Sequence, residues 1–385
     1  MLDDTPTQTS GYPTTGGGGS LSRLRRFSSK HNNGLFTKFL TTQLDPTTFK
    51  PSITFKWIPK DKKETKDEAD DSKIQQFCFP ESSSVMDTLI KSGVETIASF
   101  SFILTNSFGG KTFAYCRRLI RSEPVCFVFL SLRPHFTLFD ELFDLIQEKY
   151  LRNLKFCISE ILTSLLTFPL STSGLVSKVR VSANKAQTEN YDICYTPPNT
   201  EFDHISYETV FNMQTQHVIK LFESMLCEQR VILCSSSISR ISNTILAIHS
   251  LINPFVWQHI FISILPEPLM PYVAAPIPFL VGILDSSLKS FYQQPTEQVL
   301  MYNLDKCEFM IDPGFKSLLP PHIANYLENK LKRLKQDQPT CKDHPLVWNG
   351  FTPASALAPP TPITNTQWIQ ITNQSTIHFV NHSTL

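Results

Sequence analysis

The stretch FESMLCEQRVILCSSSISR, residues 222–240, sets the architecture of the chain. Its first part continues a helical pattern in which Val218, Leu221 and Met225 recur on one face. The run from Val231 to Cys234 is apolar at every position, which predicts a strand buried on both faces. Three serines then break the strand and offer hydroxyl caps to a following helix. We therefore expect a helix, a central strand and a second helix, in that order.

The residues after this stretch extend the same pattern. Isoleucines hold one face of a helix from Ile238 to Ile252, and Pro254 ends it. Short apolar strands are expected over 259–265 and 279–284. Residues 299–305 and 307–311 are expected to form one or two edge strands, before a basic helix that ends near Lys335. A strand, a crossover helix and a strand of these lengths form a right-handed parallel unit with helices on both faces. Residues 206–335 are thus predicted to form a three-layer α/β lobe with a mainly parallel sheet.

A different pattern precedes this lobe. Residues 97–105 alternate between apolar and polar, a turn follows at 106–110, and strands are predicted over 112–118 and 125–130. Phe136, Phe139 and Phe143 form the buried stripe of a helix that a capping box of Thr137 and Asp140 would introduce. A second helix is expected over 155–168. Residues 75–170 therefore read as an antiparallel α+β lobe.

The remaining segments have the composition of connecting or disordered chain. Residues 1–74 contain Thr, Ser and Pro clusters, a glycine run and a mixed-charge string, and we expect them to be a disordered tail. Residues 171–205 are predicted to link the two lobes, with one strand at 175–181. The Thr- and Asn-rich residues 336–385 are predicted to be a second disordered tail.

Composition excludes several classes of protein. The formal net charge of the 385 residues is +1, which gives no broad basic field for nucleic acid. The nine cysteines include no Cys-x-x-Cys pair and are expected to be reduced core thiols. The N-terminus lacks a secretory signal, and five prolines and Glu267 interrupt the longest apolar region, 264–284. We expect a cytoplasmic protein without a transmembrane segment.

Two unusual blocks of sequence carry a family resemblance. PFVWQHI at 254–260 and APIPFLVG at 275–282, following the strand at 231–234, resemble the central module of DENN-domain proteins. Upstream, FCFP at 77–80 and FAYCRRL at 113–119 look like the longin-type upstream DENN module, and the class-2 subfamily is the most similar. The resemblance stops near Lys335, where the tail stands in place of the downstream module.

Motifs for chemistry on a bound substrate do not occur. The chain has no P-loop, no dinucleotide-binding glycine fingerprint and no nucleophile-elbow Gly-x-Ser-x-Gly, so we predict no catalytic residue, cofactor or metal site. Ser235–Ser237 could hold an anion at a helix N-terminus, but capping is the favoured interpretation. Glu228 and Arg230 either form an ion pair at the sheet edge or face a partner.

The resemblance implies guanine nucleotide exchange on a Rab-type small GTPase, with peripheral association with endomembrane vesicles. Such a factor needs no acid or base; it holds the nucleotide-free GTPase in the cleft between its two lobes. The alternative is a truncated DENN adaptor that binds a Rab or another partner without exchange. A flavodoxin-like phosphate enzyme would rest only on the parallel sheet. The residues expected to contact the GTPase are Tyr115, Arg117, Arg118, Glu228, Arg230, Ser235, Ser236, Pro276 and Pro278.

Overall fold

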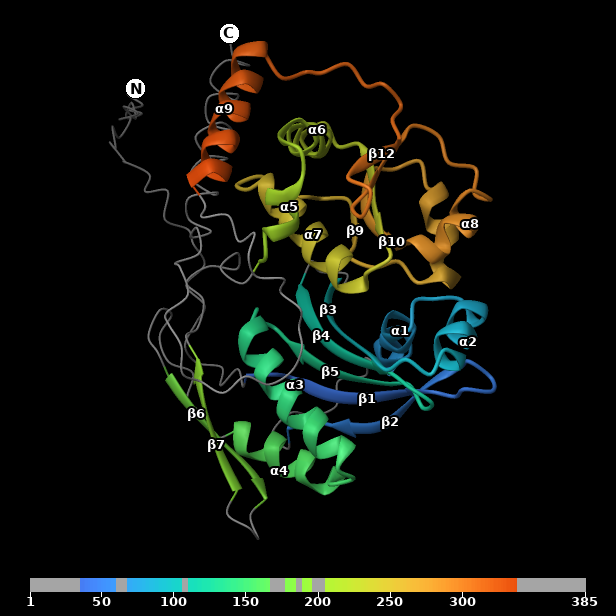
Figure 1. Cartoon of the computed structure of the whole chain (residues 1–385), viewed down its shortest axis with the longest axis vertical. Helices are drawn as coiled ribbons and strands as arrows, with labels where there is room; N and C mark the ends of the chain where they lie inside the picture. The colour runs from blue at the N-terminus through green and yellow to red at the C-terminus, as the bar shows by residue number, and fades with distance from the viewer. Residues whose placement is uncertain are drawn as a thin grey trace, which may run out of the picture. The chain divides into compact units, whose positions relative to one another are not determined.

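The structure is a computed structural model that describes residues 35–59, 68–105, 110–166, 177–184, 189–195 and 205–337. These residues form two five-stranded sheets and a two-stranded hairpin. Figure 1 shows the strands and helices coloured in their order along the chain. The first sheet precedes the second along the chain. The predicted pair of lobes, one antiparallel and one mainly parallel, is confirmed.

The first sheet has the strand order β2-β1-β5-β4-β3, and every neighbouring pair is antiparallel. Its central strand β5 is buried at every position, whereas the edge strand β3 is exposed at its start. The strands span Lys38–Leu44 (β1), Pro51–Trp57 (β2), Thr96–Thr105 (β3), Lys111–Ile120 (β4) and Val125–Ser131 (β5).

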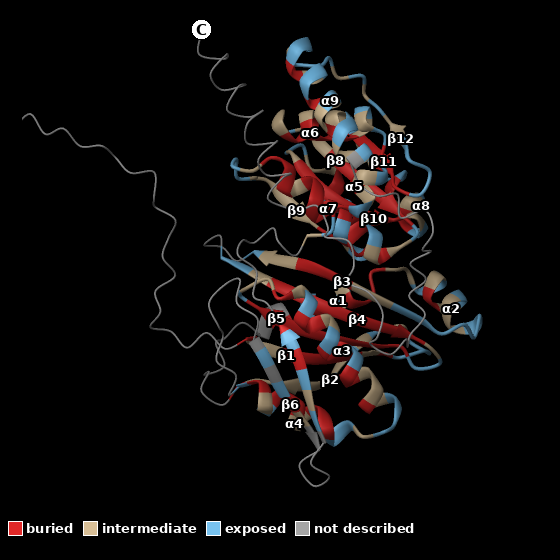
Figure 2. Cartoon of the chain, turned by 60° about the vertical axis from the view of Figure 1, so that its left-hand side comes forward, coloured by how far each residue is buried: buried red, intermediate tan, exposed pale blue. Residues whose placement is uncertain are grey.

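Helices cover both faces of this sheet, and Figure 2 shows the buried residues concentrated along the strands between them. Aromatic side chains fix one layer: the rings of Phe129 and Phe139 stack at 4.7 Å between centroids. The helices on that face are α3 (Phe136–Leu151) and α4 (Lys155–Leu166); those on the other are α1 (Glu68–Cys78) and α2 (Ser83–Lys91).

The start of α3 differs from the predicted capping box. The helix begins at Phe136, and its N-cap is His135, which makes no side-chain cap hydrogen bond. Thr137 therefore lies inside the first turn, where its hydroxyl cannot serve as the N-cap. The predicted cap was wrong because the helix begins at Phe136, two residues before the position that a cap at Thr137 would give.

The predicted disordered tail is wrong for part of its length. Strands β1 and β2 and most of α1 lie within residues 1–74. Phe36, Phe39 and Leu40 are at most 1% exposed, and Phe39 meets Phe129 with ring centroids 4.8 Å apart. A short apolar cluster between two low-complexity stretches is enough to complete the sheet, because it pairs with a strand far along the chain. Residues 1–34 and 60–67 lie outside the described residues.

The second sheet has the order β12-β11-β8-β10-β9. β8, β10, β9 and β11 are mutually parallel, and β12 runs antiparallel at one edge. Its central strand is the apolar run predicted from the sequence. The strands span Arg230–Ser235 (β8), Ile260–Ile262 (β9), Phe279–Leu284 (β10), Val299–Asn303 (β11) and Glu308–Ile311 (β12).

Two layers of helix cover this sheet, as its doubly apolar strands require. The isoleucine face predicted for α7 is buried against β8 and β10. Gly282 in β10 allows this approach, because a Cβ there would lie 2.3 Å from the Ile241 side chain. One layer contains α5 (Glu208–Asn212), α6 (Thr215–Leu226), α7 (Ile238–Leu251) and α9 (Pro321–Asp337); the other contains η1 (Glu267–Ala274), η2 (Asp285–Ser287) and α8 (Leu288–Phe291).

The segment predicted as a linker forms a hairpin. β6 (Ser177–Asn184) pairs antiparallel with β7 (Glu189–Tyr195), so one of its two strands was expected and one was missed. Val181, Ile193 and Tyr195 are buried in the same cluster as α3 and α4. The hairpin therefore belongs to the core of the first lobe.

A hydrogen-bonded contact joins the two lobes. Helix α7 packs against β3, the edge strand of the first sheet. The buried hydroxyl of Ser242 accepts from the Ser101 amide at 2.8 Å and donates to the Ser101 carbonyl at 2.8 Å. An exposed edge strand would leave these backbone groups unpaired, and α7 satisfies them. This contact positions the groove described next.

Candidate functional site

A groove of about 470 Å³ lies where the two lobes meet. Its walls come from β3, β4 and α3 of the first lobe and from the first turns of α7 in the second. Ile97, which is 56% exposed, supplies an apolar side chain at the start of β3. The other residues that line it and are used below are Ser99, Tyr115, Arg117, Asp140, Asp144, Gln147, Ser239 and Asn243.

Arg117 lies in the wall of the groove and is only 4% exposed. Its guanidinium donates to Asp144 at 2.6 Å and to the Asp140 carbonyl at 3.4 Å, and it lies 5.8 Å from the centre of the Phe143 ring. Partial burial raises the pKa of Asp140. The charge of Arg117 acts to lower this pKa, and the charge of Asp144 acts to raise it further. Two carboxylates face one guanidinium, so the α3 wall carries a net negative charge suited to a basic or hydrogen-bond-donating group of a partner.

Tyr115 lines the groove and is 2% exposed. Its hydroxyl accepts a hydrogen bond from the His135 amide at 3.2 Å, and its ring packs edge-on against Phe136 at 4.5 Å. The alternation of β4 places Tyr115 and Arg117 on the face covered by α3. Tyr115 therefore fixes the start of α3.

Arg118 points to the opposite face of β4. It is 6% exposed and makes two hydrogen bonds to the buried carboxylate of Glu81, at 2.7 and 2.8 Å. The guanidinium also lies 5.9 Å from the centre of the Phe100 ring. Arg118 thus sits in a buried ion pair beneath the segment that joins α1 to α2, outside the groove lining.

The six candidate residues from the second lobe fall at opposite ends of its sheet. Glu228, Arg230, Pro276 and Pro278 gather where β8 and β10 begin, since Arg230 pairs in register with Phe279. Ser235 and Ser236 lie at the other end of β8, five and six residues after Arg230, or about 17–20 Å away. Only this second end adjoins the groove, through Ser239 and Asn243 of α7.

Glu228 has a structural task at the start of β8. Its φ of 50° is left-handed, and the amide of the next residue, Gln229, donates to the Ser224 carbonyl at 3.0 Å. This geometry ends helix α6 in the way that glycine commonly does. The carboxylate lies 3.1 Å from the imidazole of His259, not beside Arg230.

The serine cluster after β8 is occupied by a carboxylate of the chain itself. Asp305 accepts from the Ser235 hydroxyl at 2.8 Å and from the Ser236 amide at 2.6 Å, and it pairs with Arg240. Partial burial acts to raise the pKa of Asp305, but these hydrogen bonds outweigh it and the pKa lies below its ordinary value. The Ser237 hydroxyl accepts from the Arg240 amide, which makes it the cap of α7. An internal anion therefore fills the position considered for phosphate.

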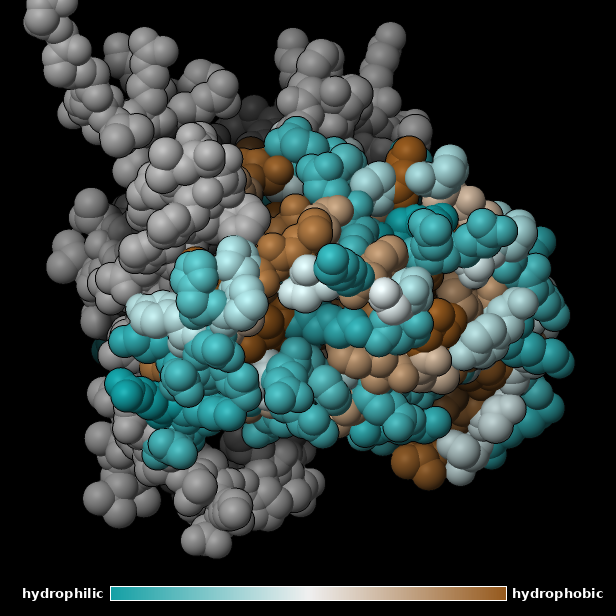
Figure 3. Space-filling model, turned by 90° about the horizontal axis from the view of Figure 1, so that it is seen from above, coloured by the Kyte–Doolittle hydropathy of each residue, from teal (hydrophilic) through white to brown (hydrophobic). Residues whose placement is uncertain are grey.

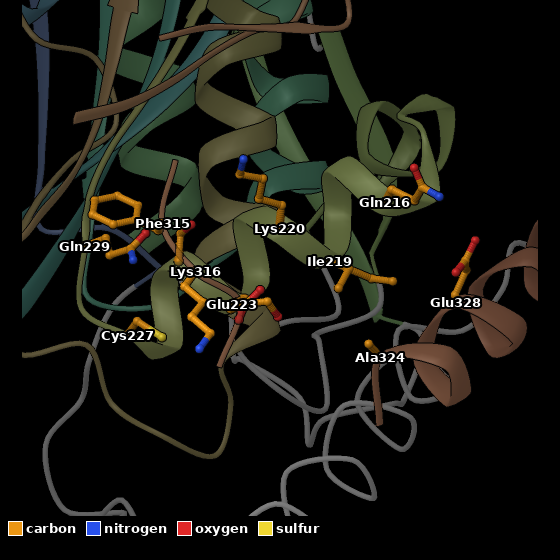
Figure 4. A pocket seen from close by; sticks show the side chains of 12 residues that line it. Gln216, Ile219, Lys220, Glu223, Cys227, Gln229, Phe315, Lys316, Ala324 and Glu328 are labelled. Atoms are coloured by element: carbon orange, nitrogen blue, oxygen red, sulfur yellow. The ribbon is translucent and has the colours of Figure 1, made fainter. Parts of the chain in front are cut away.

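A second cavity, of about 290 Å³, lies between α6, α9 and residues 315–317 (Figure 4). Glu223 projects from α6 beside Lys316, and its carboxylate accepts from the amides of Leu318 and Leu319. That carboxylate anchors the segment before α9. Figure 3 views the chain from the α9 end of Figure 1; hydrophilic side chains cover most of the described surface there, and hydrophobic ones form small separate areas.

Sequence reasoning missed most of the groove-lining residues. Asp140, Asp144 and Gln147 follow one another at helical spacing beside the phenylalanine stripe of α3. That acidic row, opposite an arginine in a neighbouring strand, was a usable signal. No sequence signal marked the other lining residues, such as Ile97, Ser239 and Asn243, because only the packing of α7 on β3 brings them together.

Comparison with known proteins gives a consistent result for both lobes. The family model described as the uDENN domain matches residues 51–119, and the one described as the DENN (AEX-3) domain matches residues 122–307. Mouse DENN domain-containing protein 2B is 31% identical over 315 residues, which cover 78% of this chain and 27% of the mouse protein. Human DENN domain-containing protein 2A is 30% identical over 268 residues, 68% of this chain and 26% of that protein.

Human DENN domain-containing protein 2C is 29% identical over 282 residues, 70% of this chain and 30% of its own length. The chain thus matches between a quarter and a third of the length of these relatives. Within the described part of the chain, no helix combines the length and the apolar character needed to cross a bilayer.

Proposed function

Because this chain belongs to the DENN-domain family, whose members generally act as exchange factors for Rab GTPases, we propose that it accelerates GDP release from a Rab-type GTPase. The observation that carries the proposal is the pair of domain matches, which together cover every residue that lines the groove and most strands of both sheets. The Rab partner would bring the protein to the cytoplasmic face of endomembranes as a peripheral component.

The proposed mechanism is differential binding. A small GTPase holds its nucleotide through switch loops and magnesium, and the loops rearrange when the nucleotide leaves. A protein that binds the nucleotide-free form more tightly must weaken nucleotide binding by the same factor. The factor therefore supplies a complementary surface, and none of its side chains has to transfer a proton.

The groove is a suitable centre for such a surface but is too small to be all of it. A stable interface of standard size buries about 800 Å² on each partner, so the GTPase would also cover the rim formed by β3, α3 and α7. Ile97 would be the apolar anchor, and the carboxylates of Asp140 and Asp144 would orient a basic group. Asn243 would contact the partner from the second lobe.

The contacts predicted from the sequence enter this proposal in different roles. Ser236, which precedes the groove-lining Ser239 by three residues, is proposed as a direct contact, whereas Tyr115, Arg117 and Ser235 would hold the walls in place. Arg118 would support β4 from behind. The four residues at the start of β8 and β10 form a separate proposed contact area: Glu228, Arg230, Pro276 and Pro278.

A fluorescent-GDP release assay over a panel of Rab proteins tests the proposal. We expect acceleration for at least one Rab, lost in Ile97→Asp and retained in Val94→Asp. Val94 is the matched control because it is 62% exposed near the same strand but does not line the groove. Exchange activity that is equal in both variants would remove the groove from the proposal, and binding without acceleration would favour the adaptor.

Charge reversal at Arg117 is a poor test, although the sequence alone suggested it. The side chain is 4% exposed between two carboxylates, so an acidic replacement would bury a third negative charge and disturb the fold. Asp144→Asn is more informative, because the carboxylate side chain is 61% exposed. Glu141→Gln is its matched control on the same helix, exposed and outside the groove.

A further inference from the structure

Three cysteines from separate elements of the first lobe meet in its interior. Cys78 is the last residue of α1, Cys116 lies in β4 and Cys126 in β5. Their sulfur atoms all lie within 4.8 Å of one another, and each residue is at most 1% exposed. Cys116 also lines the groove, but the proposed exchange function gives none of the three thiols a role.

The strand register explains how the thiols come together. Cys116 is opposite Val128 and Cys126 is opposite Arg118, so the two cysteines are diagonal neighbours on one face of the sheet. Helix α1 covers that face and ends there at Cys78. On the other side of β5, Thr42 pairs directly with Cys126, and its hydroxyl oxygen lies 3.8 Å from the Cys78 sulfur.

The surroundings of the cluster are more polar than those of an ordinary core cysteine. Arg118 and Glu81 form their buried pair close by. The Nε–H of Arg118 is buried and has no hydrogen-bond partner among the described residues. A guanidinium N–H beside thiols can donate to a thiolate sulfur, and such outer contacts stabilise metal-bound thiolates.

We propose that Cys78, Cys116 and Cys126 bind one thiophilic divalent cation, of which Zn²⁺ suits the ligands best, with the Thr42 hydroxyl as a fourth ligand. Zinc–sulfur bonds of about 2.3 Å place tetrahedral sulfurs about 3.8 Å apart, so the thiols need to close by only about 1 Å. Binding releases the remaining thiol protons to solvent. Three thiolates and one Zn²⁺ carry one net negative charge, which the nearby Arg118 offsets.

The three thiols of the cluster differ in acidity. Burial raises the pKa of Cys116 and of Cys126 well above the usual value. At Cys78 burial acts in the same direction, but side-chain hydrogen bonds with Cys116, Cys126 and Thr42, together with the charge of Arg118, outweigh it and bring the pKa well below the usual value. The bound cation would tie α1 to the centre of the sheet.

Refolding the full chain with Co²⁺ tests the site independently of any exchange activity. The chain is unfolded under reducing conditions, refolded with Co²⁺ or Zn²⁺, and freed of excess metal. We expect close to one ion per chain, sulfur-to-cobalt charge-transfer bands with the intense visible bands of a tetrahedral site, and a rise in Tm of about 5 °C or more.

Matched variants separate this cluster from other thiols. Cys126→Ser should lose the stoichiometric ion, whereas Cys157→Ser, at an equally buried cysteine in α4, should keep it. Thr42→Val should keep the ion and change the visible cobalt bands, which provides a readout if Cys126→Ser does not fold. A wild-type chain that regains its native circular dichroism yet retains no ion, or an ion retained equally by Cys126→Ser, would overturn the proposal.

Discussion

Removing the hydroxyl of Ser242 tests how the two lobes are joined. In the structure this hydroxyl satisfies both the amide and the carbonyl of Ser101, each at 2.8 Å. Ser242 is fully buried and Ser101 is 3% exposed, so water cannot replace the lost bonds. An unsatisfied buried polar group costs about 1–3 kcal/mol, and two such groups predict that Ser242→Ala lowers the free energy of unfolding by about 3 kcal/mol.

Thr244→Val is the matched control on the same helix. Thr244 is equally buried, but its hydroxyl donates to the carbonyl of Arg240 within α7. That carbonyl keeps its helical partner when the hydroxyl is lost, so the expected cost is below about 1 kcal/mol. Urea unfolding of the full chain, followed by circular dichroism, measures both values. If Ser242→Ala and Thr244→Val changed stability equally, the hydrogen bonds between α7 and β3 would not hold the lobes together.

Three further predictions concern the core. Gly282→Ala should lower the free energy of unfolding by about 2 kcal/mol or more, since its Cβ would lie 2.2 Å from the Ser263 carbonyl oxygen; an unchanged urea midpoint would contradict this. Arg118→Met should cost about 3–5 kcal/mol by stranding the buried Glu81, and Arg118→Met with Glu81→Leu should recover part of it, which a double-mutant cycle measures. Burial, aided by the charge of a nearby lysine, lowers the pKa of His249 from 6.5 to about 4, so the unfolded state binds the proton more readily than the folded state. The free energy of unfolding should therefore be at its full value above pH 6.5 and fall by up to about 1.4 kcal/mol per pH unit toward pH 4. The fall should be less steep in His249→Phe.

The second lobe could be predicted almost element by element from the sequence. Its central strand is apolar at every position, its crossover helix has an isoleucine at every turn, and its connections are short. Local periodicity and the covering rule for parallel sheets are sufficient in such a case. The family resemblance, carried by the blocks around Trp257 and Phe279, agrees with the domain matches for both lobes.

The first lobe was harder to predict from the sequence, because its strands are stabilised by pairing with strands that are distant in the chain. β1 is a seven-residue strand that becomes stable only between β2 and β5, and its neighbours in the sequence have the composition of a linker. β7 has the same difficulty, since it is buried by α3 and α4 rather than by a local pattern. Long-range pairing of this kind leaves little trace in a window of ten residues.

The candidate site was predicted at the level of the lobes but not of the side chains. A cleft between them was expected, and a groove lies there. Arginines such as Arg117 and Arg118 attract attention in a sequence because charges usually face water, yet both are buried here in ion pairs. Residues with ordinary identities, such as Ile97 and Asn243, line the groove because two elements far apart in the chain meet there.

Affinity for a Rab in its nucleotide-free and GDP-bound states tests the central claim most directly. Biolayer interferometry with each form, in magnesium-free and magnesium-containing buffer respectively, gives the two Kd values for the wild-type chain and for Ile97→Asp. We predict that the wild type binds the nucleotide-free form at least about tenfold more tightly, and that Ile97→Asp abolishes this preference while Val94→Asp keeps it. Equal affinity of the wild-type chain for both forms, across every Rab it binds, would contradict exchange by differential binding.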